Sequence, residues 1–414
     1  MGPSMTPPID AARARRARIA VSMLFFSHGA IAAAVFPRLP AIKDTLGLTN
    51  AELGIAVAGV PIGGLLAGGL AGVFIARSGS AHIAVVSGIG AAIALAAIGL
   101  ATSFAMLFGA YLVYGMFDAT MDAAMNTHSL GVQRVYGRSI LQRFHGMWSL
   151  GGMAAGAAGA IAAGLAIAVA PYLVVTAVVL GVAIISAYRS LLPTAVADAH
   201  PATDGVADEP VHLRHAGRLL RVLGPIAMLG ILCIVLQSAA SIWSAVYLAD
   251  VLGLAAGLAG AGFVVFITAM AIGRLTNDRW IDRWGGTDVV RGGALIAGAG
   301  VLAAMLADPL GVPPLAFIGF AAIGYGSASF FPVMILAAGS RPGIPTGHAV
   351  ALVAWLVRLG LVFAPTAIGL AADEAGLAVA FAIPLGAAVL IAVFAVPLTG
   401  RLARAAPHAV AHAS

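Results

Sequence analysis

The sequence contains little charge. Asp, Glu, Lys and Arg together make up 9% of the 414 residues, whereas 61% of the residues are hydrophobic. A soluble domain carries roughly 25% charged residues, which keep its surface hydrated. So few charges cannot cover a water-facing surface of this size, and this excludes a soluble globular protein.

Cysteine and the common catalytic motifs are also missing. The one cysteine, Cys233, excludes a disulfide inside the chain and a thiolate metal site. The sequence has no Gly-Lys-Ser/Thr phosphate loop, no His-Glu-x-x-His and no nucleophile elbow. We therefore expect no enzyme activity, no cofactor, no metal and no ATP-driven pumping.

Long apolar segments are abundant, and each is long enough to cross a hydrocarbon core of about 30 Å as a helix. They lie at about 18–40, 51–76, 81–102, 104–127, 142–166, 170–191, 220–248, 257–280, 287–306, 313–338, 346–370 and 376–400. The 52 glycines favour close packing between such helices. The pattern predicts an all-α membrane protein with twelve transmembrane helices. They form two six-helix bundles, 1–191 and 219–414, joined by a polar linker at 192–218.

The basic residues predict the orientation in the membrane. Of the 22 Arg and Lys residues, nineteen lie on the N-terminal side of the predicted spans, and only Arg38 and Lys43 lie on the other side. The positive-inside rule then places both termini and the linker in the cytoplasm of a multi-pass inner-membrane protein. The net charge of +6 thus reports topology, and we expect no nucleic-acid partner.

A short internal repeat links the two halves. Arg77-Ser78-Gly79 follows the second predicted span, and Arg283-Trp284-Gly285 follows the eighth, 206 residues later. Together with the six-plus-six spacing, this predicts two parallel structural repeats, which are common among transporters.

Longer motifs carry a resemblance to a family. The stretch from Gly72 to His82 resembles the loop Gly-x-x-x-Asp-Arg-x-Gly-x-Arg-Arg of the major facilitator superfamily, with Ala76 in place of the aspartate; a second copy runs from Asp278 to Gly285. Asp122-Ala-Ala-Met-Asn126 and Arg143-Phe-His145-Gly resemble the sugar-permease-like branch that includes fucose permease. The resemblance implies a carrier with two rocking bundles. It also implies gating roles for Arg77, His145, Asp282 and Arg283.

Ionisable side chains inside spans are costly, and they usually face a cavity. In the fourth span, Asp118, Asp122 and Asn126 recur every four residues and form a polar stripe on one helix face. Two carboxylates one turn apart disfavour each other's ionisation, so one of them can hold a proton near neutral pH. We predict that Asp118 and Asp122 couple transport to protons. Alternatively, they only hydrogen-bond to neighbouring helices.

Several other polar side chains are candidates for substrate binding, although each can equally be a packing residue. They are His28, Asn126, Gln237, Ser241, Trp243, Tyr325, Ser329 and Arg358. Arg358 lies near the middle of its predicted span, 346–370. It can bind an anionic group of the substrate or pair with Asp118 or Asp122.

These features predict a secondary active transporter for a small polar organic solute, such as a sugar or a sugar acid, driven by protons and acting as a monomer in the lipid bilayer. Two alternatives remain open. One is an exporter of drugs or metabolites with the same fold, and the other is a membrane sensor that does not transport.

Overall fold

The computed structural model describes residues 10–198, 216–341, 344 and 346–395, and these residues are almost entirely helical. The elements are α1 (Ala11–Ala33), the 3-10 helix η1 (Phe36–Arg38), α2 (Leu39–Leu46), α3 (Asn50–Ser78), α4 (Ser80–Gly99), α5 (Phe104–Tyr136), α6 (Leu141–Gly164), α7 (Val169–Tyr188), α8 (Thr194–Ala197), α9 (Ala216–Ser241), α10 (Trp243–Asp250), α11 (Ala256–Trp284), α12 (Gly286–Ala307), α13 (Pro314–Ser327), α14 (Phe330–Gly339), α15 (Thr346–Ala375), α16 (Leu377–Ala380) and α17 (Ala382–Phe394). The prediction of an all-α membrane protein is confirmed.

Within the described residues, 11 helical segments are long and apolar enough to cross a membrane, one fewer than the twelve predicted. The segment that does not qualify is α6. It has 24 residues, but it begins with polar side chains and contains many glycines, which lower its mean hydropathy.

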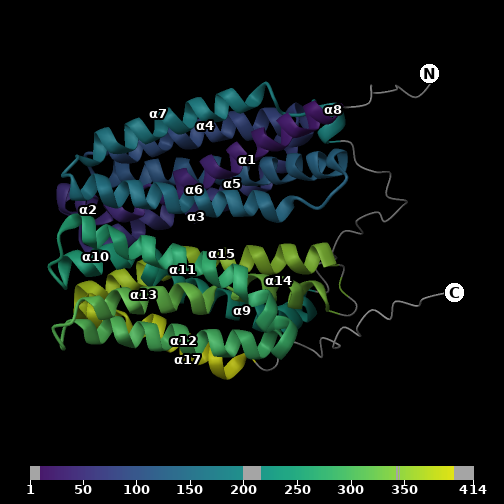
Figure 1. The fold of residues 1–414 in the computed structure, drawn as a ribbon. Helices are drawn as coiled ribbons and strands as arrows, with labels where there is room; N and C mark the ends of the chain where they lie inside the picture. The colour runs from purple at the N-terminus through teal and green to yellow at the C-terminus, as the bar shows by residue number, and fades with distance from the viewer. Residues whose placement is uncertain (1–9, 199–215, 342–343, 345, 396–414) are drawn as a thin grey trace, which may run out of the picture.

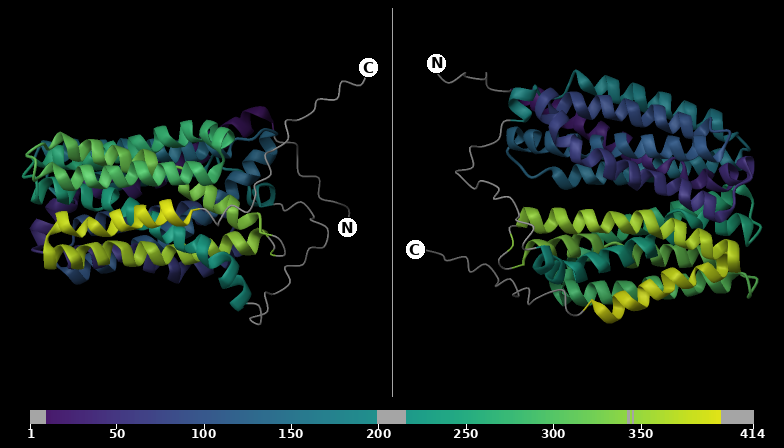
Figure 2. Two further views of the ribbon diagram at one scale, coloured as in Figure 1. Left: turned by 90° about the horizontal axis from the view of Figure 1, so that it is seen from below. Right: turned by 180° about the vertical axis from the view of Figure 1, so that it is seen from behind.

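The helices form two groups that lie side by side (Figure 1). The first group contains α1 to α8, and the second contains α9 to α17. The long helices of both groups run along the length of the molecule. Helices α2 and α10 lie at one end, which we call the α2–α10 face, and α8 lies at the other end, which we call the α8 face. The groups approach each other most closely at the α2–α10 face (Figures 1 and 2).

The internal repeat extends well beyond one tripeptide. Adding 206 to the bounds of α3 gives the bounds of α11, and the starts of α4 and α12 differ by the same number. Gly79 (φ 83°, ψ 149°) and Gly285 (φ 85°, ψ 155°) make the turns between these helices in the same left-handed conformation. Only glycine adopts such a φ without strain, which explains why the repeat retains it.

The predicted linker, 192–218, lies partly outside the described residues. Its first part packs on the first group: the Asp198 carboxylate accepts hydrogen bonds from the backbone N–H (2.9 Å) and the hydroxyl (2.5 Å) of Ser80 at the start of α4. The backbone N–H of Leu192 donates to Nε2 of the buried His128 (3.2 Å). At its other end, residues 216–218 already belong to α9.

Polar contacts join the two groups at the α2–α10 face. Lys43 forms an ion pair with Asp250 at 2.5 Å. The carboxylate of Asp373, near the end of α15, accepts hydrogen bonds from the backbone N–H groups of Asn50 (2.9 Å) and Ala51 (2.8 Å). These are the first N–H groups of α3, which lack partners within their own helix and favour an anion.

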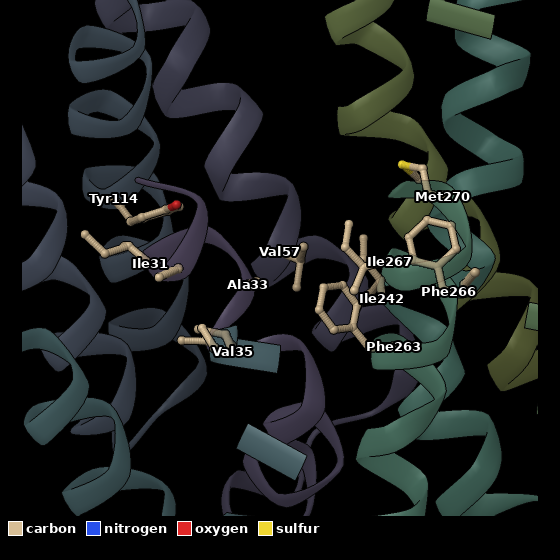
Figure 3. Close-up of a cluster of buried hydrophobic side chains, with 14 of the residues drawn as sticks. Ile31, Ala33, Val35, Val57, Tyr114, Ile242, Phe263, Phe266, Ile267 and Met270 are labelled. Atoms are coloured by element: carbon tan, nitrogen blue, oxygen red, sulfur yellow. The ribbon is translucent and has the colours of Figure 1, made fainter. Parts of the chain in front are cut away.

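Behind these polar contacts, the two groups share one buried apolar cluster. Val57 of α3 faces Ile242 and Ile267 of the second group (Figure 3). Phe36 stacks on Phe263, with ring centroids 4.9 Å apart. We call the part of the cluster that lies between the groups on the α2–α10 side the apolar plug. It includes Phe36, Val57, Ile242, Phe263 and Ile267.

Candidate functional site

A cavity of about 330 Å³ lies between the two groups, next to the apolar plug. Helices α1, α3, α4, α5 and α6 of the first group line it, together with α9 and α15 of the second group. The side chains that carry polar atoms into its wall are His28, Tyr111, Tyr114, Asp118, Asp122, Trp148, Ser241 and Arg358. The structure therefore brings together both predicted proton-coupling residues and three of the predicted substrate-binding residues, His28, Ser241 and Arg358.

Asp118 is the best-connected polar residue of this cavity. Its Oδ1 lies 2.8 Å from Nε2 of His28 on α1 and accepts a hydrogen bond from the Tyr114 hydroxyl at 3.0 Å. Tyr114 lies one turn earlier on α5, so the helix repeat itself aligns the two side chains. Asp118 is thus held by an imidazole from α1 and by a hydroxyl from its own helix.

Asp122 has fewer side-chain partners than Asp118. It lies one turn after Asp118, and its Oδ1 accepts a hydrogen bond from the side-chain amide of Asn126 at 3.0 Å. Among the described residues, no cation lies within 4.0 Å of its carboxylate. Of the two carboxylates, Asp122 therefore has the fewer fixed partners.

Arg358 enters the cavity from the second group. It lies twelve residues into α15, and its Nη1 is 3.5 Å from the carbonyl oxygen of Gly64 on α3. A Cβ on Gly68 would lie 3.3 Å from the same nitrogen, so the small residues of α3 leave room for the guanidinium. Within the described chain, Arg358 has no carboxylate partner within 4.0 Å, and the predicted bridge to Asp118 or Asp122 is not formed in this conformation.

Two further polar atoms at the cavity lack a partner in the described part of the chain. They are the hydroxyl of Tyr111 and Nδ1 of His28, and both are buried. Buried polar atoms without a hydrogen bond are rare, because leaving such a group unpaired costs about 1–3 kcal/mol.

Five predicted substrate-binding residues do not line this cavity. Asn126 bonds to Asp122 instead, Gln237 lines a separate pocket, and Trp243 is fully buried. Tyr325 and Ser329 line a third pocket of about 250 Å³ between α11, α12 and α13.

Helix breaks explain two of these positions, Trp243 and Ser329. The prediction extended one straight helix through each span, but α9 ends at Ser241, and α13 ends at Ser327. The following residues therefore point in directions that simple helical spacing does not give. Gly324, the repeat counterpart of Asp118, packs on α11, where a Cβ would lie 2.3 Å from the carbonyl oxygen of Phe266.

The predicted gating residues lie toward the α8 face. Arg77 is exposed at the end of α3, and Asp282 and Arg283 are exposed at the end of α11. His145 is also exposed, one turn into α6, where its ring packs edge-on against Phe25 at 5.3 Å. In the described residues, none of the first three forms an ion pair within 4.0 Å.

One functional candidate was missed by the sequence prediction. Arg274 belongs to the nineteen basic residues assigned to the cytoplasmic side, but it lies ten residues before the end of α11, at a depth of about 15 Å along the helix. It continues the buried face of α11 that carries Phe263, Ile267 and Met270, at steps of four, three and four residues. That periodicity is the signal that could have identified it.

The family and its relatives agree with this architecture. The model of the Major Facilitator Superfamily matches residues 21–343, well over half of the chain. A protein of Yersinia pestis described as an uncharacterized MFS-type transporter is 30% identical over 370 residues, which cover 88% of this chain and 91% of that protein. Membrane protein MosC of Rhizobium meliloti is 26% identical over 375 residues, 90% of this chain and 88% of that protein.

Solved structures share the fold at low sequence identity. The nucleoside transporter NupG superposes with a TM-score of 0.75 at 14% identity, over 91% of this chain and 97% of that one. The D-xylose-proton symporter gives a TM-score of 0.74 at 14% identity, over 93% of this chain and 98% of that one. The family match, the relative at 30% identity and the two-group architecture lead to one conclusion: the chain belongs to the major facilitator superfamily.

Proposed function

We propose that this protein is a proton-coupled secondary active transporter that moves a small polar organic solute across the inner membrane by alternating access. The observation that carries the proposal is the cavity between the two groups. It holds a fixed carboxylate (Asp118), a freer carboxylate (Asp122) and a cation that has no carboxylate partner among the described residues (Arg358). A carrier requires a solute site at the interface of two moving parts, and a proton-driven carrier also requires a titrating group at that site.

We further propose that each group is one rocking unit, 1–191 and 219–414, and that α6 is the twelfth crossing. The glycines of α6 support this assignment, because they let it pack tightly on α1. A Cβ on Gly151 would lie 2.0 Å from the carbonyl oxygen of Phe26, and one on Gly29 would lie 2.0 Å from that of Trp148. A helix packed this closely along α1 crosses the bilayer with it.

The contacts between the groups indicate which conformation this is. The polar contacts and the apolar plug close the α2–α10 face, whereas His145 and Arg274 remain exposed toward the α8 face. With the α8 face in the cytoplasm, as the arginine distribution predicts, the structure corresponds to an inward-facing state.

The solute is a polar organic molecule in this proposal. Tyr111, His28, Ser241 and Arg358 offer hydrogen-bonding groups, and Trp148 offers an aromatic face. The names of the two structural neighbours, a nucleoside transporter and a xylose-proton symporter, fit a solute of this kind.

The experiment that tests the function is uptake into liposomes containing the purified protein. A pH difference of one unit, acid outside, should accumulate the transported compound about tenfold per coupled proton, because one unit corresponds to about 1.4 kcal/mol. Sugars, sugar acids, nucleosides and small carboxylates form the test panel. No entry of any compound beyond that into protein-free liposomes, with or without the pH difference, would argue for a non-transporting sensor.

The topology can be tested in intact cells by cysteine labelling in a Cys233→Ser background. Ser139 lies exposed in the α5–α6 connection near the α8 face, and Glu374 lies exposed near the end of α15. We expect an impermeant maleimide to label Glu374→Cys and to leave Ser139→Cys unmodified until the cells are opened. The reverse labelling would show that the orientation is inverted.

The contacts at the α2–α10 face should stabilise the inward-facing state, and Asp373 should contribute more free energy to it than Lys43. An exposed ion pair contributes about 0.2–1 kcal/mol, whereas each of the two hydrogen bonds to Asp373 contributes about 0.5–1.5 kcal/mol. We expect Asp373→Ala to shift the equilibrium toward the outward-facing state about tenfold and Lys43→Ala to shift it less.

The readout is labelling of Val35→Cys, at the cavity wall, by an impermeant thiol reagent added from outside. The neighbouring Glu374 makes no hydrogen bond or ion pair in the described chain, so Glu374→Ala is the matched control and should change nothing. Equal acceleration by Asp373→Ala and Glu374→Ala would show that the bonds between Asp373 and α3 do not hold the closed face.

A further inference from the structure

A second cavity of about 220 Å³ lies inside the second group of helices, toward the α8 face. Residues of α9, α11, α12, α14 and α17 line it, and no residue lines both this cavity and the central one. Gln237, at its wall, precedes Ser241, at the wall of the central cavity, by one turn of α9. We call it the C-terminal pocket.

The walls of the C-terminal pocket are mostly apolar. Leu229, Phe331 and Met334 are typical of them, and the polar exceptions include Cys233, Gln237 and Arg274. The side-chain amide of Gln237 donates to the sulfur of Cys233 at 3.5 Å, so these two groups satisfy each other. An apolar cavity of about 150 Å³ in another protein stays dry and binds benzene, so a pocket of this size and lining has room for a hydrocarbon body.

Arg274 provides the charge at this pocket. It lies about 15 Å from the end of α11, and yet it is an exposed side chain. Within the described residues, it has neither an ion pair within 4.0 Å nor a hydrogen bond, although Asp278 follows it by one turn on α11. An arginine keeps its charge at this depth, so an anion from outside the chain is its natural partner.

We propose that the C-terminal pocket is a second ligand site, which binds an organic carboxylate with a compact apolar body, such as an alkyl-substituted benzoate. The carboxylate pairs with the guanidinium of Arg274, which presents two parallel N–H groups for it. The apolar body lies among Leu229, Phe331 and Met334 and leaves water. This proposal holds whichever solute occupies the central cavity, because the two cavities share no lining residue.

Cys233 provides a direct reporter, because its sulfur is at the pocket wall and it is the only cysteine of the chain. We would measure its alkylation by a membrane-permeant maleimide in protein reconstituted in lipid nanodiscs, with and without 4-ethylbenzoate. At ten times its dissociation constant, a bound probe should slow alkylation about tenfold, since about one site in ten then remains free. The neutral 4-ethylbenzamide has the same ring and should protect little.

Three variants locate the effect. Arg274→Gln should abolish protection by 4-ethylbenzoate, and Arg274→Lys should retain part of it. Protection is measured against each variant's own unprotected alkylation rate, because Arg274 lies near Cys233 and its replacement by glutamine also changes the reactivity of the thiol. Arg358→Gln should leave protection unchanged, because Arg358 lines the central cavity. The proposal is overturned by a lack of protection in the parent protein, by equal protection from the amide, by protection that survives Arg274→Gln, or by protection that disappears in Arg358→Gln. The comparison of acid with amide needs no variant and decides the case even if Arg274→Gln fails to fold.

Discussion

Arg358→Gln is expected to lower the transport rate about tenfold to a hundredfold at an unchanged protein level. A hydrogen bond to a charged group contributes about 1.5–3 kcal/mol, and each 1.4 kcal/mol corresponds to a factor of ten. Among the described residues Arg358 has no carboxylate partner, and it makes one long contact, at 3.5 Å, to the backbone of Gly64. Its charge is therefore available to an anionic or strongly polar group of the solute.

Three further variants identify the role of Arg358. Arg358→Lys keeps the charge but loses the planar pair of donors, so we expect an intermediate rate. Gly68→Ala places a Cβ about 3.3 Å from the guanidinium and should reduce transport, whereas Gly69→Ala, whose Cβ meets nothing within 4 Å, is its matched control. If Arg358→Gln instead loses stable protein and Asp122→Asn restores it, Arg358 serves as an internal ion-pair partner and not as a solute ligand.

Asp122→Asn is expected to abolish accumulation against a gradient while leaving exchange of solute across the membrane partly intact. The variant keeps the size and most of the hydrogen bonding of the side chain but removes its proton. Under a pH difference of one unit, we expect the accumulation ratio to fall from about ten to about one, because one coupled proton then contributes about 1.4 kcal/mol in the parent protein and none in the variant.

Asp118→Asn should be milder if Asp122 is the titrating group. Asp118 accepts bonds from His28 and Tyr114, and an asparagine oxygen can still accept both of them. Normal pH-driven accumulation in Asp122→Asn, together with its loss in Asp118→Asn, would reverse the two roles. Glu374→Gln, an exposed carboxylate remote from the cavity, controls for the loss of one negative charge.

Much of the fold could be predicted from the sequence, because the bilayer constrains it so strongly. An unsatisfied backbone group in lipid is costly, so long apolar segments must be helices, and this part of the prediction is confirmed. The tripeptide ending at Gly79 and its counterpart ending at Gly285 identified the repeat because the same left-handed turn requires glycine in both places. Of the twelve predicted spans, only α6 is not apolar enough to count as a membrane span in the described part of the structure, because its glycines, which serve packing, lower its hydropathy.

The site could be predicted only in part. Asp118 and Asp122 lie on an unbroken stretch of α5, so helical spacing placed them together correctly. Gln237 and Trp243 lie on either side of the break between α9 and α10, and no local sequence pattern predicts this break. The contact between Arg358 and Gly64 spans 294 residues, and such pairings arise from the packing of the two groups.

The central claim, that solute and proton move together through the cavity at Asp122, is tested most directly by a proton-flux measurement. Liposomes containing the protein and an internal pH-sensitive dye, with no initial pH difference, receive the transported solute on the outside. The account predicts immediate internal acidification in the parent protein, reduced acidification in Asp118→Asn, and none in Asp122→Asn although labelled solute still exchanges. Solute entry without acidification in the parent protein, or undiminished acidification in Asp122→Asn, would contradict it.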